Sequence, residues 1–401
     1  MARSTLTEIP VLVGRIVPVM LLVAALYGAP ASAQTVALVP APRSPAQTEA
    51  VEQASEGIRT WLAENDIPGV TVAVGLDDYV VWAEGFGWAD LEQQVPVTAL
   101  TRFRTGSVGK ALTAAAVGLL VERGRLDLDA PVQRYVSGFP EKRWPVSTRQ
   151  LMAHTAGVRH YRGDDEPLSA VHYDDVLASL DIFAGDSLLF RPGTAYGYST
   201  YGWNLVGAVV QEASGRPFLE FMRLEVFSPA RMTSTVPDDV FGIVPHRARF
   251  YDRDPEGHLR NADFVDQSNK WPGGGYLSTP SDLVRFGFAM LDRELLEPET
   301  VELLWTPVTV ESGEPTPGGL GWALANVQGR AMVGHGGRSV GGTAALMIFP
   351  EERMIVSVMT NVTAAAPAPI ALLLARLFDP AAAGGEPGHW TIPRRLQESH
   401  R

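Results

Sequence analysis

The sequence predicts a protein of the α/β (α+β) class, with an antiparallel sheet flanked by terminal helices and an inserted helical lobe. Three observations predict it. Strand-like runs lie near both ends of the chain, an apolar helical pattern stands outside each group of strands, and residues 111 to about 300 between them are mostly helical in pattern with long polar loops. Because the two groups of strands can share one sheet, the middle of the chain is expected to form a lobe beside it.

The expected elements follow from local patterns. Residues 49–65 have the apolar spacing of an amphipathic helix, and two strands, 69–75 and 79–84, follow it around a turn. Strong helix formers at 111–123 predict a second helix, which Gly124 ends. Towards the other end, the sequence predicts strands at 319–327, 331–335, 343–349 and 354–360 and a last helix at 370–378.

Composition limits the classes of protein. The chain has 401 residues, of which 46% are hydrophobic and 19% charged, as expected of a globular protein with a large core. Its net charge of −12 and scattered arginines argue against nucleic-acid binding, because an acidic surface repels phosphate. Cysteine is absent, so no thiolate nucleophile or Cys-ligated metal is available.

The first 33 residues have the pattern of a secretory signal peptide. Arg3 and Arg15 precede an apolar run, 16–26, and the segment Ala29-Pro-Ala-Ser-Ala33 fits an Ala-x-Ala cleavage site. The apolar run is short for a membrane span, so we expect a periplasmic or secreted protein with no stable span after cleavage near Gln34. The alternative is an uncleaved anchor.

The remaining chain is expected to divide into three parts. These are a Pro-rich linker at 34–46, a single catalytic domain with two lobes at 47–378, and a flexible tail rich in Gly, Pro and charge at 379–401.

Only three lysines occur in the chain, and Lys110 stands three positions after Ser107. Residues three apart on a helix lie on one face, so the hydroxyl and the amine can come within hydrogen-bond reach, and a helix N-terminus favours developing negative charge. The pair therefore predicts a serine nucleophile beside its base. The alternative is that Ser107 caps the helix and Lys110 is a solvated surface lysine.

Two further segments carry residues suited to the same chemistry. A phenol can share or relay the proton of a Ser-Lys pair, and Tyr198 is the best candidate among three tyrosines at 196–201, which could equally form a packing cluster. The segment 333–342 holds His335 and Arg338 among glycines that let the backbone approach a ligand. Its alternative interpretation is a Gly-rich hairpin with a surface histidine.

Together, Ser107-x-x-Lys110, Tyr198-Ser-Thr200 and His335-Gly-Gly337 resemble the Ser-x-x-Lys, Tyr-x-Asn and Lys/His-x-Gly motifs of the serine beta-lactamase and penicillin-binding-protein superfamily, in order and rough spacing. The resemblance covers roughly residues 47–378. Stretches such as Arg159-His-Tyr161 look especially like the mitochondrial serine beta-lactamase-like protein and its bacterial relatives, a subgroup regarded as peptidase-like. The resemblance implies a beta-lactamase/transpeptidase-like fold related to class C beta-lactamases.

The resemblance also implies catalytic roles. Ser107 would be the acylated nucleophile, Lys110 its proton acceptor or the partner that keeps Tyr198 reactive, and Tyr198 the group that protonates the leaving group and then activates water. The backbone N–H groups of Ser107 and Arg338 would form the oxyanion hole. The expected enzyme is a peptidase or amidase, with an esterase or a D-amino-acid-peptide carboxypeptidase as alternatives on the same site.

The substrate-binding residues implied by the resemblance are His335, Gly337, Arg338 and Thr200. Two positions depart from the usual motifs, since Thr200 replaces an asparagine and Gly336 replaces a hydroxyl residue. Both usual side chains help to hold a beta-lactam, so we expect slow or no beta-lactam hydrolysis. His154 is usually structural in this superfamily and anchors a loop below the cleft.

The sequence also allows two other interpretations of the protein's function. Residues 337–341 form a Gly-x-Ser-x-Gly, which would make Ser339 the nucleophile of an α/β hydrolase with Asp379 and His389. However, that motif needs a helix after the serine, and residues from Thr343 onward predict a strand. A non-catalytic binding or assembly protein is the alternative of another class.

No cofactor or metal is expected. The eight histidines form no His-Glu-x-x-His, and no carboxylates stand at ligand spacing. The expected partner is a peptide or small acyl substrate. The resemblance also implies self-association, because the mitochondrial relative polymerises.

Overall fold

The computed structural model describes Met1 and residues 44–163 and 165–379. The expected signal peptide, nearly all of the expected linker and the expected tail beyond Asp379 lie outside the described residues. From residue 44 onward, the described chain falls in a single unit. Within it, no helix combines the length and the apolar character needed to cross a bilayer.

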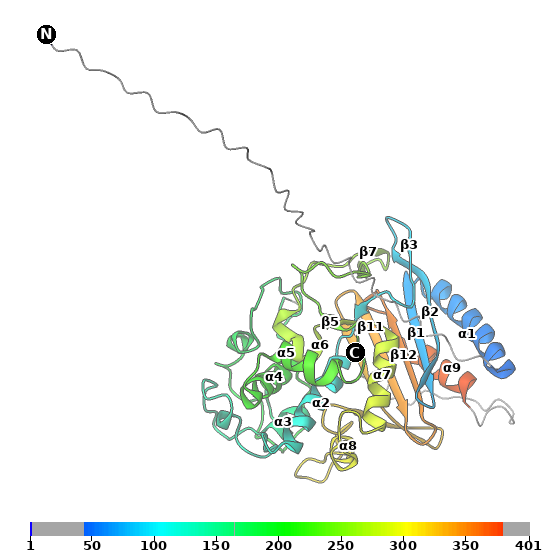
Figure 1. Cartoon of the computed structure of the whole chain (residues 1–401). Helices are drawn as coiled ribbons and strands as arrows, with labels where there is room; N and C mark the ends of the chain where they lie inside the picture. The colour runs from blue at the N-terminus through cyan, green and yellow to red at the C-terminus, as the bar shows by residue number, and fades with distance from the viewer. Residues whose placement is uncertain (2–43, 164, 380–401) are drawn as a thin grey trace. The chain divides into compact units, whose positions relative to one another are not determined.

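A seven-stranded antiparallel sheet built from both ends of the chain forms the centre (Figure 1). In order across the sheet, the strands are β3 (Val95–Pro96), β2 (Tyr79–Asp90), β1 (Gly69–Leu76), β12 (Met354–Thr360), β11 (Gly342–Phe349), β10 (Arg330–Ser339) and β9 (Ala323–Val327). Strands β1 and β12 lie side by side in it, with Val70 opposite Thr360 and Leu76 opposite Met354, so the two ends of the domain meet at this pair.

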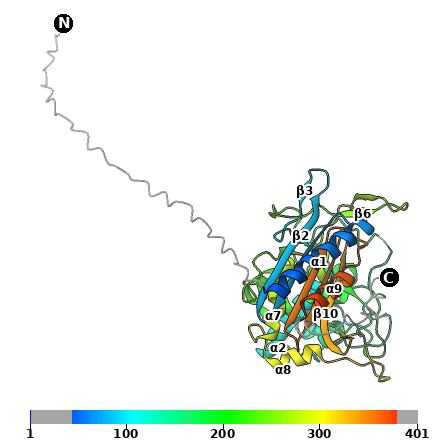
Figure 2. The same ribbon diagram turned by 90° about the vertical axis from the view of Figure 1, so that its right-hand side faces the viewer.

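Two helices, α1 (Pro45–Glu64) and α9 (Ala368–Phe378), cover one face of the sheet (Figure 2). Strand β1 is buried along its whole length because the opposite face is covered as well. Its alternate residues Val70, Val72 and Val74 pack in the core with the two helices, whereas Ala73 belongs to the core of the other face. Burial of each such valine stabilises the fold by about 1.5–3 kcal/mol.

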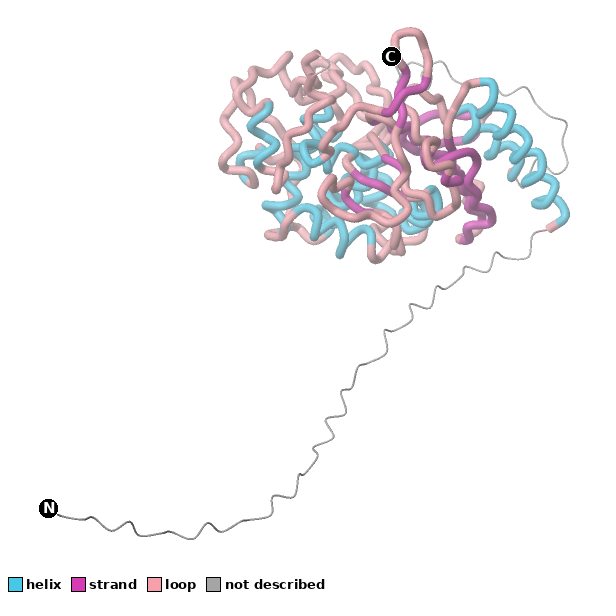
Figure 3. Tube along the Cα trace, turned by 90° about the horizontal axis from the view of Figure 1, so that it is seen from above, coloured by secondary structure: helices cyan, strands magenta, loops and turns pink. Residues whose placement is uncertain are grey.

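The middle of the chain forms the helical lobe against the other face, and seen from above the sheet lies between this lobe and α1 (Figure 3). Helix α2 packs against β10 and against the lobe helices α4 and α6. The lobe and its neighbours comprise α2 (Val108–Glu122), η1 (Val132–Arg134), α3 (Thr148–Met152), η2 (Ala178–Ile182), α4 (Thr200–Ser214), α5 (Phe218–Phe221), the π-helical η3 (Met222–Phe227), η4 (Ser268–Lys270), α6 (Trp271–Gly274), α7 (Pro280–Leu291) and α8 (Pro298–Trp305).

Two small sheets complete the fold. One has the order β4 (Phe103–Arg104), β8 (Tyr276–Ser278) and β5 (Val236–Pro237), and the other pairs β6 (Tyr251–Arg253) with β7 (Leu259–Asn261). Strand β4 leads directly into α2, so this small sheet fixes where α2 begins.

The predicted architecture is confirmed, with differences at element ends. Helix α1 begins at Pro45, inside the segment expected as linker, because Ser44 and Gln47 form a capping box there. Strand β9 begins later than expected, since Gly319 donates its N–H to the carbonyl of Trp322 and turns the preceding chain. Strand β10 continues past the expected end at His335, because it stays paired with β11 through Ser339.

Candidate active site

Ser107 is the residue before the first turn of α2, but its side chain makes no capping hydrogen bond. Its Oγ instead lies 2.8 Å from the Nζ of Lys110 and 2.8 Å from the hydroxyl of Tyr198. The side chain is partly exposed. The interpretation of Ser107 as a helix cap is therefore wrong, and its hydroxyl has the two polar partners that a nucleophile needs.

Lys110 is fully buried, so the alternative of a surface lysine is wrong as well. Besides Ser107, its Nζ donates to the Gly273 carbonyl at 3.1 Å and to the Thr200 hydroxyl at 3.3 Å. Burial disfavours the charged amine and lowers the pKa of Lys110 from 10.5 to about 7. At neutral pH, a large fraction of this amine can accept a proton.

Tyr198 is the tyrosine of the 196–201 cluster that hydrogen-bonds Ser107. Tyr196 is 41% exposed, and the Tyr201 hydroxyl donates to the Oε2 of Glu166 at 3.0 Å. Burial raises the pKa of Tyr198 to about 12, and the Nζ of Lys110 lies 4.9 Å from the centre of its ring. Tyr198 therefore keeps its proton at neutral pH and can donate it.

Two histidines hold the backbone that follows Tyr198. The N–H of Ser199 donates to the Nδ1 of His154 at 3.1 Å, and the N–H of Thr200 donates to the Nδ1 of His160 at 3.2 Å. The His154 ring also stacks on the Tyr198 ring, with centroids 4.3 Å apart. Burial and the nearby Lys110 lower the pKa of His160 to about 4, and burial takes the pKa of His154 well below 6.5. Both rings are thus neutral acceptors that orient the Tyr198 loop.

Strand β10 brings the third motif against the start of α2. Gly106 has φ +48°, and a Cβ added to it would lie 2.5 Å from the backbone nitrogen of Arg338. A Cβ added to Gly337 would lie 2.0 Å from the carbonyl oxygen of Thr105. Only glycine allows this approach, which sets the backbone of Arg338 beside that of Ser107.

The side chains of the same strand lie further out. Arg338 is exposed and His335 is half-buried, with its Nδ1 2.5 Å from the carbonyl oxygen of Gly336. Thr200 is buried beside Lys110, as described above, and its hydroxyl lies where it can fix the amine. The structure therefore gathers Ser107, Lys110, Tyr198 and Thr200, and brings the backbone of Gly337 and Arg338 to them.

The geometry argues against Ser339 as a nucleophile. Ser339 ends β10 opposite Gly342 in a hairpin to β11, so the strand-to-helix elbow that a Gly-x-Ser-x-Gly nucleophile needs is missing at this position. Asp379 is ion-paired with Arg330. His389 lies outside the described residues.

Within residues 44–163 and 165–379, no three His, Asp or Glu side chains are grouped so as to hold a metal ion. A cavity of about 390 Å³ lies along α7 and α8, where Leu296, Val301 and Trp305 line it. None of the Ser107, Lys110 or Tyr198 side chains lines this cavity. The candidate site is therefore identified by the distances between its polar groups and not by this cavity.

Several residues of the site were not identified from the sequence. These are His160, the Gly273 carbonyl that accepts from Lys110, and Arg159, whose carbonyl accepts from the Ser199 hydroxyl at 2.6 Å. In the sequence, these residues stood out only because they lie in stretches that resemble the superfamily. A carbonyl or a ring nitrogen that orients a distant loop has no local pattern.

Fold and site together are those of a class of protein, the serine hydrolases with a beta-lactamase/transpeptidase-like fold. The sequence profile of the Beta-lactamase family matches residues 49–378, and the chain belongs to that family. It is therefore a serine hydrolase of the beta-lactamase and penicillin-binding-protein type, as the resemblance implied.

Relatives agree with this assignment. The human mitochondrial serine beta-lactamase-like protein LACTB is 31% identical over 88% of this chain and 83% of its own length. A D-aminopeptidase of Gluconobacter oxydans is 28% identical over 77% of this chain and 58% of its own length. Among solved structures, the octameric penicillin-binding protein homologue from Pyrococcus abyssi superposes with a TM-score of 0.71 at 26% identity, covering 82% of this chain and 76% of that one.

Proposed function

We propose that this protein is a peptidase or amidase that acts through an acyl-enzyme on Ser107, with Lys110 and Tyr198 as its proton-transfer groups. One observation carries the proposal: the Ser107 Oγ lies 2.8 Å from both the amine and the phenol, and the amine is fully buried. A hydroxyl, a base and an acid are thereby assembled within hydrogen-bond distance.

The two pKa shifts support the roles proposed for the two proton-transfer groups. Because the pKa of Lys110 is about 7 and that of Tyr198 is about 12, the neutral amine accepts the Ser107 proton while the phenol still holds its own. The Ser107 Oγ attacks the carbonyl carbon, and the oxyanion that forms faces the backbone N–H groups of Ser107 and Arg338. Such a donor typically contributes about 3 kcal/mol to the transition state.

Collapse of the tetrahedral intermediate breaks the bond to the leaving group. Tyr198 gives its proton to the leaving nitrogen, and the protonated Lys110 restores the proton of Tyr198. In the second half, the same pair removes a proton from water, whose oxygen attacks the acyl carbon. The bond from that carbon to the Ser107 Oγ then breaks, and the pair returns the proton to the Ser107 Oγ. Atoms and protons balance, and one amide bond is hydrolysed in each cycle.

The substrate class follows from the site and from the relatives. His335, Gly337, Arg338 and Thr200 are proposed to bind the substrate, and Arg338 is exposed. A guanidinium can pair with a carboxylate through two hydrogen bonds. D-amino-acid peptides and esters are the alternative substrates, and the D-aminopeptidase relative favours the former. Because Thr200 and Gly336 depart from the beta-lactam-binding motifs, nitrocefin is expected to turn over slowly or not at all.

The test is intact-mass spectrometry of the protein treated with a fluorophosphonate probe. The wild type and the Ser339→Ala control are expected to gain one adduct, and Ser107→Ala none. An adduct that survives in Ser107→Ala and is lost in Ser339→Ala would refute the proposal. Fast nitrocefin hydrolysis would contradict the assignment of substrate class.

Two further expectations belong to the proposal. The N-terminal pattern supports a periplasmic or secreted protein, whereas the human relative is mitochondrial. Sequencing the N-terminus of the mature protein tests this, since a start near Gln34 supports cleavage and a start at Met1 contradicts it. Self-association is supported by the octameric Pyrococcus abyssi homologue, and light scattering of the purified protein tests it.

A further inference from the structure

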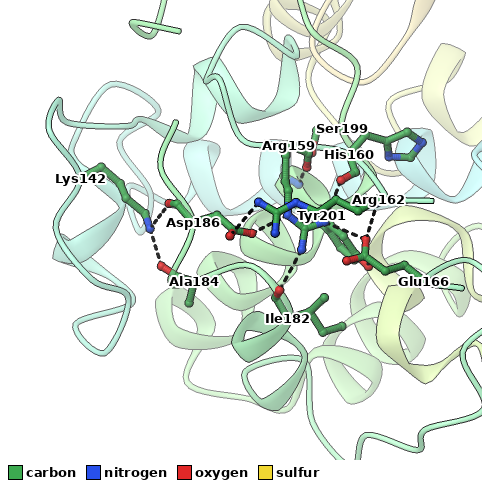
Figure 4. Close-up of polar contacts among 11 residues, drawn as sticks. Lys142, Arg159, His160, Arg162, Glu166, Ile182, Ala184, Asp186, Ser199 and Tyr201 are labelled. Carbon is green, nitrogen blue, oxygen red and sulfur yellow. Dashed lines mark hydrogen bonds and ion pairs between the residues drawn. The ribbon is translucent and has the colours of Figure 1, made fainter. Parts of the chain in front are cut away.

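A buried arginine lies behind the loop that carries Tyr198. Arg159 is 6% exposed, and its guanidinium bridges the carboxylates of Glu166 and Asp186 (Figure 4). The same group donates to the carbonyl oxygens of His160 and Ile182, each at 3.0 Å. We call Arg159, Glu166 and Asp186 the Arg159 cluster.

The cluster is tied to the catalytic loop through the backbone. The carbonyl oxygen of Arg159 accepts the Ser199 hydroxyl at 2.6 Å, and this hydroxyl in turn accepts the Gly202 N–H at 2.9 Å at the start of α4. The next residue, His160, accepts the N–H of Thr200. The Arg159–His160 segment therefore holds both residues that follow Tyr198.

The Glu166 carboxylate of the cluster also ties the same loop. The Oε2 of Glu166 accepts from Arg159 at 2.7 Å and from the Tyr201 hydroxyl at 3.0 Å, and the Arg159 guanidinium lies 5.0 Å from the centre of the Tyr201 ring. Asp186 is itself anchored, since the Nζ of Lys142 donates to its carbonyl at 2.8 Å (Figure 4). The three residues that follow Tyr198 are thus all tied to this segment: Ser199 to Arg159, Thr200 to His160 and Tyr201 to Glu166.

The number and direction of these bonds require an arginine. The guanidinium is planar and presents five N–H donors in a fixed fork, whereas lysine offers a single point charge. A lysine at position 159 keeps the charge but cannot reach Glu166, Asp186 and Ile182 together. The Tyr198 loop would then lose the support of these hydrogen bonds, although the net charge of the cluster is unchanged.

We propose that Arg159 is a positioning residue, which holds the Tyr198 loop so that the Tyr198 hydroxyl stays at 2.8 Å from the Ser107 Oγ. The inference rests on the proposed function, in which Tyr198 protonates the leaving group. A displacement of about 1 Å in such a group can cost about 100-fold in rate. Loss of Arg159 is therefore expected to imitate loss of the Tyr198 proton.

The experiment compares two esters on purified variants of the full chain. p-Nitrophenyl acetate has a good leaving group that needs no proton, whereas phenyl acetate has a poorer one that gains from protonation. Because both esters form the same acetyl-enzyme, the comparison uses kcat/KM, which reports the acylation step in which the leaving group departs. Arg159→Lys is expected to lower kcat/KM about 100-fold for phenyl acetate and less than about 10-fold for p-nitrophenyl acetate, and the same pattern is expected for Tyr198→Phe. Arg330→Lys is the matched control, because Arg330 also bridges two carboxylates, those of Glu352 and Asp379, at the far end of β10. It is expected to leave both rates unchanged.

A double variant separates positioning from a general loss of stability. Arg159→Lys is expected to slow phenyl acetate hydrolysis no further in a Tyr198→Phe background, because the proton that it positions is already gone. Equal losses for both esters, or losses that multiply in the double variant, would overturn the inference. If Arg159→Lys does not fold, Glu166→Gln takes its place, since it removes one charge from the cluster at constant size. Activity that persists in Ser107→Ala would instead refute the proposed function itself.

Discussion

Replacement of Lys110 by methionine is expected to abolish acylation of Ser107 and, at the same time, to make the protein more stable. Lys110 is fully buried, and burial lowers its pKa from 10.5 to about 7. At about 1.36 kcal/mol per pKa unit, holding this amine in the fold costs about 4 kcal/mol at pH 7. Methionine has a similar length and no charge, so that cost disappears.

Part of this gain in stability is offset by lost hydrogen bonds. The Gly273 carbonyl, to which the amine donates at 3.1 Å, would lose a partner, and an unpaired buried polar group costs about 1–3 kcal/mol. The Thr200 contact is longer, at 3.3 Å, and its hydroxyl can rotate, so it is not counted as a second unpaired group. A net gain of about 1–3 kcal/mol in the free energy of unfolding is therefore expected for Lys110→Met. Urea unfolding at pH 7, followed by tryptophan fluorescence, measures it.

The sign of the pH dependence provides a second check. Between about pH 7 and pH 10.5 the unfolded lysine binds a proton that the folded one has lost, so the stability of the wild type rises with pH in this window. The advantage of the variant is largest at and below pH 7 and shrinks towards pH 10. Lys142→Met is the comparison variant. Burial lowers the pKa of Lys142 too, but this side chain is only partly buried and donates to the Asp186 carbonyl outside the site, so a smaller change in the same direction is expected. A Lys110→Met protein less stable than the wild type at pH 7, or one whose difference does not change with pH, would refute this reasoning.

Three other outcomes are expected. The kcat/KM for p-nitrophenyl acetate should rise with pH through a limb near pH 7 as Lys110 loses its proton, and a flat profile between about pH 6 and 8 would contradict the assignment of the base. Gly106→Ala should slow fluorophosphonate labelling more than about 10-fold, because its Cβ would meet the Arg338 backbone. Gly124→Ala is the control, since Gly124 has φ +62° and an added Cβ would have nothing within 4 Å. This variant should label normally and be less stable by about 1–2 kcal/mol. Since the pKa of His160 is lowered to about 4, the unfolded state binds more protons between about pH 6.5 and 4, and stability measured by urea unfolding should fall as pH falls through that window. His160→Gln should flatten this slope, and an unchanged slope would show that other groups produce it.

Local patterns predicted the sheet and the Ser-Lys pair well. Apolar, strand-like runs predicted β1 and β12, and the offset of three residues predicted that Ser107 and Lys110 lie on one face, because both follow from the geometry of a single element. The length of β10 was underestimated, because its second half is defined by pairing with β11 and its glycines have no strand pattern.

The tyrosine proposed as catalytic could not be chosen by local patterns alone. Tyr196, Tyr198 and Tyr201 stand within six residues, and only the packing of two distant segments brings one hydroxyl to Ser107, 91 positions away in the chain. The roles of Arg159 and His160 were missed for the same reason, since they act on Ser199 and Thr200 across 40 positions.

By itself, the sequence determined the class of fold, the family and the pairing of Ser107 with Lys110, because periodicity and motif spacing are properties of neighbouring residues. Only the tertiary structure decided that Lys110 is buried, that its pKa falls to about 7 and that Tyr198 is the phenol beside it. These properties depend on removal of water and on contact between distant segments, and neither exists until the lobe has packed against the sheet.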